Sequence, residues 1–228
     1  PMSFVSLFET WQPHGDTYRW DAPAGWGQGR ALFGGMVAAA GASLSATLTP
    51  RPLRTVQAQL MGPVVAGAVT AVAKILREGR TTTFIEVRLS QEDQERAVLG
   101  LVHIAPRAGA IRVGGASAPT WETPLDAVEP LPYIPGTTPE FIEHMDMRFA
   151  VGKPPFSGAN AASFGGYAAI RGETEVGPLH QPALLAPTLR RGHADDTMTP
   201  LLAPATPTAP NPTVPAPHPL CRPPQPPF

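Results

Sequence analysis

The sequence predicts an α+β fold in which a long antiparallel sheet wraps around one central helix. The first observation is a segment over residues 31–50 that contains no charged side chain and shows helical periodicity. The second is a series of runs over residues 53–104 that alternate or are rich in β-branched residues. Because an apolar helix needs a cover on nearly every side, these runs are expected to form a curled sheet around it.

The helix is expected over about residues 34–48. Its apolar residues recur at the spacing i, i+3, i+4 and i+7, namely Val37, Ala40, Gly41, Leu44 and Leu48. The other faces carry only small or weakly polar side chains, so the helix should be buried nearly all round. The predicted helix contains glycines and hydroxyl side chains and few strongly apolar residues, which argues against a membrane span.

Four strands are expected after the helix, over residues 53–61, 68–76, 81–89 and 96–104. Turns are expected between the last three, at the sequences REGR and QEDQE. The strands are predicted to form an antiparallel meander. The earlier sequence DTYRWDAP, over residues 16–23, is predicted to add an edge strand.

Composition divides the chain into four parts. Residues 3–107 carry the periodic patterns, and residues 108–139 are punctuated by Gly and Pro as a linker is. Residues 140–186 are patterned again and are followed by a proline-rich tail over residues 187–228, expected to be irregular. The hydrophobic content of 43% is enough for a sizeable core.

Charge and cysteine content exclude several function classes. The formal net charge is −1 and the Lys and Arg residues are scattered, which argues against a nucleic-acid partner or an anionic membrane surface. The single cysteine, Cys221, excludes an internal disulfide and a cysteine metal cluster, and favours a reducing compartment. No export-type segment opens the chain, so a cytoplasmic protein is expected. Motifs of serine hydrolases, nucleotide-binding folds and zinc proteases are absent from the sequence.

Three segments together resemble a known family. These are ALFGGMVAAAGASLSATL, LRTVQAQLMGPV and AVAKILREGRTTTFIEVRLSQEDQERAVLGLVHIAPR. Over residues 10–107 the chain resembles the first half of the double-hotdog acyl-CoA thioesterases of the thioesterase II type. The resemblance implies a hotdog fold with an incomplete second half. It also implies an acyl-CoA substrate, no cofactor or metal, a role in lipid metabolism and a homo-oligomer formed through the hotdog sheet.

The resemblance gives the helix start a chemical role. A thioester carbonyl can approach the free N–H groups there, and Gly34 and Gly35 leave those groups open. Gly35 is therefore a candidate catalytic residue, and Phe33, Gly34 and Met36 are candidate substrate-binding residues. The alternative is that the two glycines merely let the sheet cross the helix start.

The catalytic side chains of the family have fewer counterparts in this chain than the helix start does. The family uses an acidic residue on the second-half helix, a hydroxyl on the next strand and a glutamine on the last strand. The first half of this chain has Gly41, Thr55 and His103 at the corresponding places, and only the hydroxyl matches. Thr55 and His103 are candidate catalytic residues. Each has a structural alternative, as a strand residue and as a satisfied core histidine respectively.

The second half departs from the family partway through. Residues 140–154 and 165–186 resemble the opening strands and the approach to the second helix, but a proline-rich sequence then replaces the expected helix and strands. A frame change in a GC-rich gene is one hypothesis for this replacement. We therefore expect an acyl-CoA thioesterase whose hydrolysis is impaired. The alternatives are a non-catalytic acyl-CoA-binding or protein-interaction module, and a hotdog hydratase or dehydratase, for which residues 34–49 lack the needed Asp and His.

Overall fold

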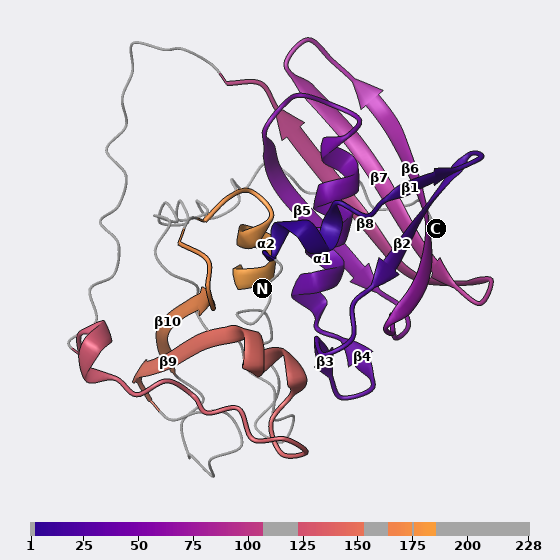
Figure 1. The fold of residues 1–228 in the computed structure, drawn as a ribbon. Helices are drawn as coiled ribbons and strands as arrows, with labels where there is room; N and C mark the ends of the chain where they lie inside the picture. The colour runs from indigo at the N-terminus through magenta and orange to yellow at the C-terminus, as the bar shows by residue number, and fades with distance from the viewer. Residues whose placement is uncertain (1–2, 107–122, 153–163, 175, 186–228) are drawn as a thin grey trace, which may run out of the picture. The chain divides into compact units, whose positions relative to one another are not determined.

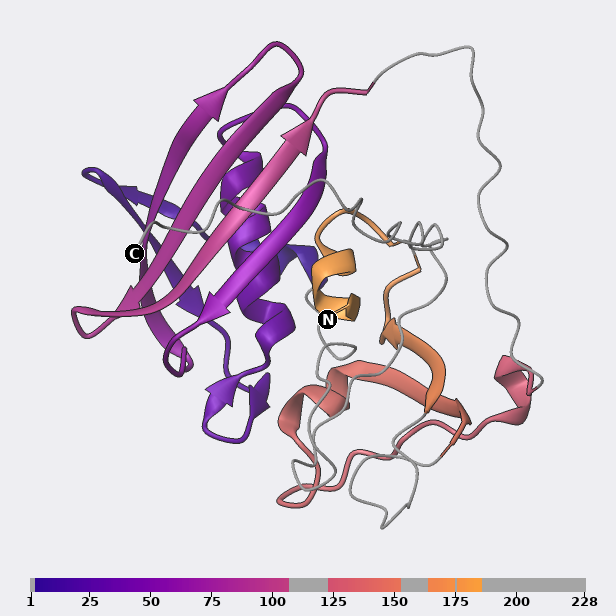
Figure 2. The same ribbon diagram turned by 180° about the vertical axis from the view of Figure 1, so that it is seen from behind.

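The computed structural model describes residues 3–106, 123–152, 164–174 and 176–185 (Figures 1 and 2). All of them belong to one unit of the structure. The main sheet has six strands in the order β1-β2-β6-β7-β8-β5. Their bounds are β1 Gln12–His14, β2 Thr17–Ala22, β5 Leu53–Leu60, β6 Gly67–Glu78, β7 Thr82–Gln91 and β8 Gln94–Ile104.

The central helix α1 spans Gly34–Ala46 and lies against the sheet, which curls around it (Figures 1 and 2). Burial alternates along β7: Ile85, Val87 and Leu89 face the core, and Phe84 and Arg88 face outward. Each apolar side chain buried in this way contributes about 1.5–3 kcal/mol. The predicted layout of one buried helix inside an antiparallel sheet is confirmed.

Gly41 lets α1 lie close to the sheet. A Cβ atom at this position would come within 2.7 Å of Leu99 Cδ2 on β8. The position therefore faces the first-half core, and a carboxylate there would be buried against a leucine at a large desolvation cost.

The strand order corrects the predicted meander. Of the four strands predicted after the helix, only β6, β7 and β8 follow one another as hairpins, whereas β5 pairs with β8 at the far edge of the sheet. The connection from β5 to β6 contains Gly62 and Pro63, and Val64 within it accepts a hydrogen bond from the Leu32 N–H at 2.7 Å. The chain thus crosses beside the start of α1 instead of turning back. The segment predicted as an edge strand forms β2, which is covered by the short β1.

Smaller elements complete the described residues. The first-half elements are η1 Val5–Phe8 and the hairpin of β3 Gly27–Gln28 and β4 Ala31–Leu32. Later come η2 Leu125–Ala127, η3 Glu140–His144, β9 Met145–Val151, β10 Gly165–Ile170 and α2 His180–Leu185. The strands β9 and β10 pair as a separate two-stranded sheet, and α2 packs against α1.

The domain boundaries proposed from composition stay a prediction. All of the predicted tail, like residues 108–122 of the predicted linker, lies outside the described residues.

Candidate functional site

The start of α1 is an uncapped helix N-terminus. The hairpin of β3 and β4 leads into it, and the Phe33 N–H donates to the Trp26 carbonyl at 2.8 Å. Phe33 is the N-cap residue, and its side chain makes no capping hydrogen bond. Because the first amides of a helix have no acceptor within the helix, the N–H groups of Gly34 and Gly35 and the helix dipole point toward any group placed there.

The two glycines have different surroundings. A Cβ atom on Gly34 would meet only Leu60 Cδ1, at the ordinary contact distance of 3.4 Å. A Cβ atom on Gly35 would lie 2.8 Å from both the Cα and the carbonyl oxygen of Ala183 in α2, and would collide with the Phe33 ring. Gly35 therefore has a packing role between α1 and α2, and Gly34 is the glycine that leaves space.

The other two predicted substrate-binding residues are buried. Phe33 is 2% exposed and Met36 is fully buried. The Phe33 ring stacks on Phe141 of η3 with the centroids 4.3 Å apart and an interplanar angle of 11°. These side chains form the apolar base beneath the helix start.

Two titratable side chains that the sequence reasoning missed lie against the segment leading into α1. His144 stacks on Trp26 with a centroid distance of 4.4 Å, and its Nε2 is 3.0 Å from the Gly25 carbonyl. Since a carbonyl only accepts, Nε2 carries a hydrogen, and in the neutral ring the lone pair is therefore on Nδ1. Glu140 accepts a hydrogen bond from the Gly27 N–H at 3.1 Å. Both residues belong to η3, and no pattern in the sequence connects η3 with the helix start.

His103 lies at the opposite end of α1. It is 1% exposed, with Nδ1 2.8 Å from the Arg51 carbonyl and Nε2 3.0 Å from Ser45 Oγ. The carbonyl requires a hydrogen on Nδ1. The Ser45 hydroxyl has one hydrogen, which either the Ala42 carbonyl at 2.8 Å or Nε2 of a neutral ring can accept. Ser45 is ten residues beyond Gly35, which is about 15 Å along a helix. The structure does not bring His103 and Gly35 together.

Thr55 is also distant from the helix start. It is exposed on β5, opposite Val102 of β8. The residue of β5 that reaches Gly34 is Leu60, five positions further on, which is about 17 Å along a strand. Thr55 and His103 both lie toward the other end of the helix, so the three predicted catalytic residues do not form one cluster.

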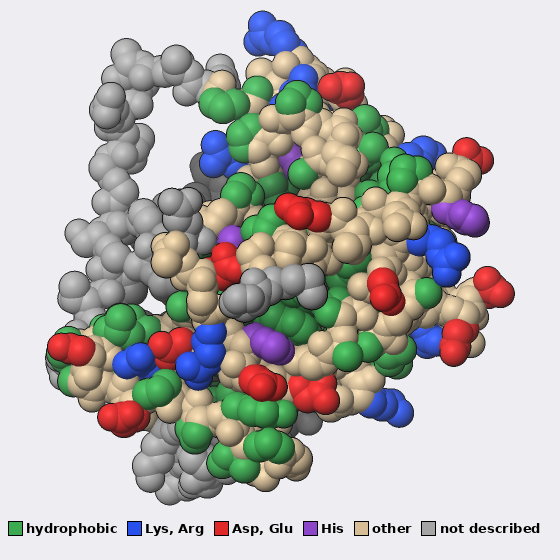
Figure 3. Space-filling view, in the orientation of Figure 1, with side chains coloured by type: hydrophobic (Ala, Val, Ile, Leu, Met, Phe, Trp, Pro, Cys, Tyr) green, Lys and Arg blue, Asp and Glu red, His purple; other side chains and the backbone are tan. Residues whose placement is uncertain are grey.

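Figure 3 shows Lys and Arg side chains dispersed over the visible face. Within the described ranges, no group of three or more His, Cys, Asp or Glu side chains could hold a metal ion. No helix in that part of the chain is long and apolar enough to cross a membrane.

Comparison with known proteins finds a family match in the first half. Residues 22–105 match the family of acyl-CoA thioesterase N-terminal domains. No curated protein matches the sequence.

Solved structures support the fold. The chain is similar to the acyl-CoA thioesterase II TesB2 of Mycobacterium marinum, with 16% identity, a TM-score of 0.54 and coverage of 79% of this chain and 66% of that one. A hot dog fold protein of unknown function from Alicyclobacillus acidocaldarius is 13% identical, with a TM-score of 0.58 and coverage of 71% and 60%. A protein of Thermobifida fusca, provisionally named a thioesterase II, is 18% identical, with a TM-score of 0.56 and coverage of 64% and 53%. The chain thus spans less than two thirds of the length of these structures, and its fold is a hotdog.

Proposed function

We propose that this chain, whose residues 22–105 match the acyl-CoA thioesterase N-terminal domain family, binds acyl-CoA and hydrolyses its thioester slowly. The observation that carries the proposal is the uncapped start of α1, where Gly34 has no side chain and is half-buried. The substrate class is a fatty acyl or other acyl-CoA, which places the reaction in lipid metabolism.

The helix start supplies electrostatic stabilisation. A thioester carbonyl oxygen lying at the amides of Gly34 and Gly35 would gain negative charge as water attacks its carbon, and the N–H groups and helix dipole favour that charge. Gly34 provides the approach, because its only close neighbour is a flexible leucine side chain. Phe33 and Met36 support this position from beneath.

Water activation is the weak part of the site. Helix α1 contains no ionisable side chain at all. The attacking water must lose a proton as the C–O bond forms, and the departing CoA thiolate must gain one. Of the described residues, His144 offers the Nδ1 lone pair of its neutral ring beside the segment that leads into the helix. General-base assistance contributes about 10²–10⁴ in rate, so a poorly placed base leaves slow hydrolysis.

The proposal is tested with purified protein and a panel of acyl-CoA chain lengths. Gly34→Val adds a side chain at the helix start, and we expect it to lower kcat/KM by about 10²–10³ with little loss of stability. Gly100→Val is the matched control, since a Cβ atom at Gly100 has no neighbour within 4 Å. Equal activity of the two variants would show that the helix start takes no part in the reaction.

A non-catalytic acyl-CoA-binding module is the second candidate. The uncharged α1 favours it, because binding needs no proton acceptor. Saturable acyl-CoA binding with no release of free thiol, in the wild type and in Gly34→Val alike, would establish this alternative. A hydratase or dehydratase would instead change the acyl chain and leave the thioester intact.

Self-association through the sheet is part of the same proposal. The edge strand β5 is eight residues long and ends at Leu60, which is 55% exposed, next to Met61, which is 53% exposed. A long edge with exposed apolar side chains is a template for pairing with another strand. We propose a cytoplasmic homo-oligomer paired at this edge. Analytical ultracentrifugation at micromolar concentration tests it, and a strict monomer would contradict it.

A further inference from the structure

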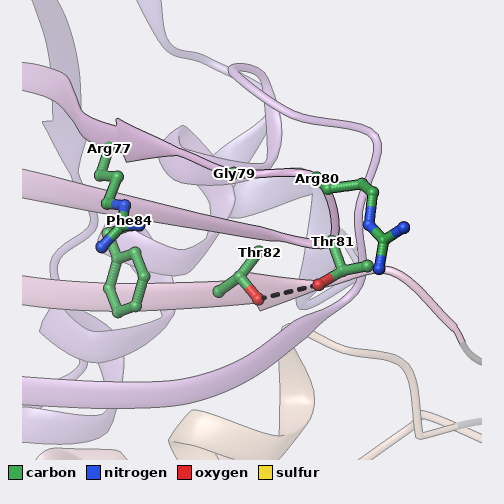
Figure 4. A pocket seen from close by; sticks show the side chains of 6 residues that line it. All are labelled: Arg77, Gly79, Arg80, Thr81, Thr82 and Phe84. Atoms are coloured by element: carbon green, nitrogen blue, oxygen red, sulfur yellow. Dashed lines mark hydrogen bonds between the residues drawn. The ribbon is translucent and has the colours of Figure 1, made fainter.

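We propose that a hollow at the β6–β7 turn binds a nucleotide that carries at least two phosphate groups. The hollow has a volume of about 290 Å³ and is open to solvent (Figure 4). It is lined by Arg77, Gly79, Arg80, Thr81, Thr82 and Phe84. None of these residues has a part in the thioesterase reaction proposed above.

The hollow carries positive charge that its neighbours leave unneutralised. Among the described residues, no hydrogen bond or ion pair engages the guanidinium of Arg77 or Arg80. The adjacent carboxylate, Glu78, lies 3.7 Å from the guanidinium of Arg51 instead. On the same face of the sheet, Glu86 is bound by Arg88 at 2.7 Å. Guanidinium groups match phosphate oxygens in geometry and charge, so a phosphorylated ligand suits this site.

An aromatic ring lies beside the charge. Phe84 is 40% exposed and is the register partner of Arg77 across the two strands. Figure 4 shows the Arg77 guanidinium beside the Phe84 ring, with Arg80 on the other side of the two threonines. A planar base can stack on the ring while the two arginines, one at each side, take separate phosphate groups. This arrangement favours a nucleotide with two or more phosphates over a simple anion.

Polar groups between the arginines complete the site. The hydroxyls of Thr81 and Thr82 are hydrogen-bonded to each other at 3.5 Å, and the one that accepts in this bond can donate its own hydrogen to a phosphate oxygen. The Gly79 N–H donates to the Thr82 carbonyl at 2.8 Å, which closes the turn and fixes the spacing of the lining residues. The backbone of the β6–β7 hairpin therefore fixes the shape of the hollow.

The hollow lies on the outer face of the sheet. Phe84 points outward, and the next residue, Ile85, is 1% exposed on the face that packs against α1. The sheet therefore separates the hollow from the helix start, and the ligand of this hollow is distinct from a thioester held at Gly34. Two ligands carry a base and phosphates of this kind: a free nucleotide, and the nucleotide end of a CoA molecule bound on the outer face.

Titration calorimetry at low ionic strength, with ADP, CoA and inorganic pyrophosphate as probes, tests the proposal. We expect ADP or CoA to bind, and the double variant Arg77→Gln/Arg80→Gln to weaken that binding by about tenfold or more. The matched control is Arg19→Gln/Arg54→Gln, which removes two exposed arginines elsewhere on the sheet. Phe84→Leu should weaken nucleotide binding and leave pyrophosphate binding unchanged. Circular dichroism of each variant confirms that it is folded.

Every outcome bears on the proposal. Tighter binding of ADP identifies a free nucleotide as the source, and tighter binding of CoA identifies the cofactor's nucleotide end. Absence of nucleotide binding overturns the proposal, as does an equal effect of the two double variants. Pyrophosphate binding as tight as ADP binding, with no effect of Phe84→Leu, would show a simple anion site and would also overturn it. These measurements do not depend on hydrolysis, so they stand apart from the proposed thioesterase activity.

Discussion

The two ends of α1 are held in opposite ways. At the start, Gly35 carries no side chain, and the backbone of Ala183 packs directly on it. At the end, Ser45 and His103 are joined by a buried hydrogen bond. The start depends on the absence of a side chain at Gly35 and is sensitive to an addition there. The end depends on polar partners and is sensitive to any removal.

Removing the buried histidine should have the largest effect. His103→Ala leaves a buried cavity, and it leaves the Arg51 carbonyl without the ring N–H that binds it. We expect it to lower the free energy of unfolding by about 3–4 kcal/mol. Denaturant titration measures this loss. Activity per folded molecule should be retained, and a selective loss of activity would instead make His103 catalytic.

Adding atoms at the other end should have the next largest effect. Gly35→Val forces a side chain against the Ala183 backbone, and overpacking of this kind costs about 1–3 kcal/mol. We expect stability and activity to fall together, because α2 is displaced from the helix start. Thermal unfolding and acyl-CoA hydrolysis, measured on the same preparation, check this result. A loss of activity at unchanged stability would show that Gly35 acts only on substrate.

Acid should weaken the contacts of Glu173 beside α2, which packs against the start of α1, before it affects the other end of α1. The Phe4 N–H donates to Glu173 at 2.6 Å, and this bond, with a smaller contribution from His180, lowers the pKa of the Glu173 carboxyl below its usual 4.5. A lowered pKa means that the stabilisation is complete above about pH 4.5 and is lost as the pH falls through the folded-state value.

The matched variant is Glu173→Gln. We expect it to lower stability by about 1.5 kcal/mol at pH 7 and to flatten the loss of stability below pH 4.5. Urea titrations between pH 3 and pH 7 measure the slope. An unchanged acid slope in the variant would show that other carboxylates control it.

The smallest effect is expected at the open glycine. In Gly34→Ala the new methyl group meets Leu60 at 3.4 Å, an ordinary contact, and alanine favours the helix by up to about 1 kcal/mol. We expect a stability change within about 0.5 kcal/mol, measured by thermal unfolding. A loss as large as that of Gly35→Ala would show that the two glycines are equally packed and would remove the difference between them.

Periodicity alone located the helix and the long strands of the first half. The helix predicted over residues 34–48 spans Gly34–Ala46, and the run predicted over residues 81–89 is contained almost entirely in β7, Thr82–Gln91. These patterns are local, because burial on one face or on all faces leaves a period in the sequence. Strand order leaves no such trace, which is why the predicted meander was wrong about β5.

The two glycines also show which features the sequence determines locally and which depend on tertiary packing. Their position at the helix start is a property of the sequence, but the difference between Gly34 and Gly35 depends on Ala183, about 150 residues away in the chain. The same holds for His144, which reaches the segment before α1 through a stacking contact with Trp26 that no spacing encodes. Residue type and period determined the fold of the first half and the chemistry available to it. Only the packing of distant segments decided which of those groups meet, because contacts between them depend on three-dimensional distance and not on separation along the chain.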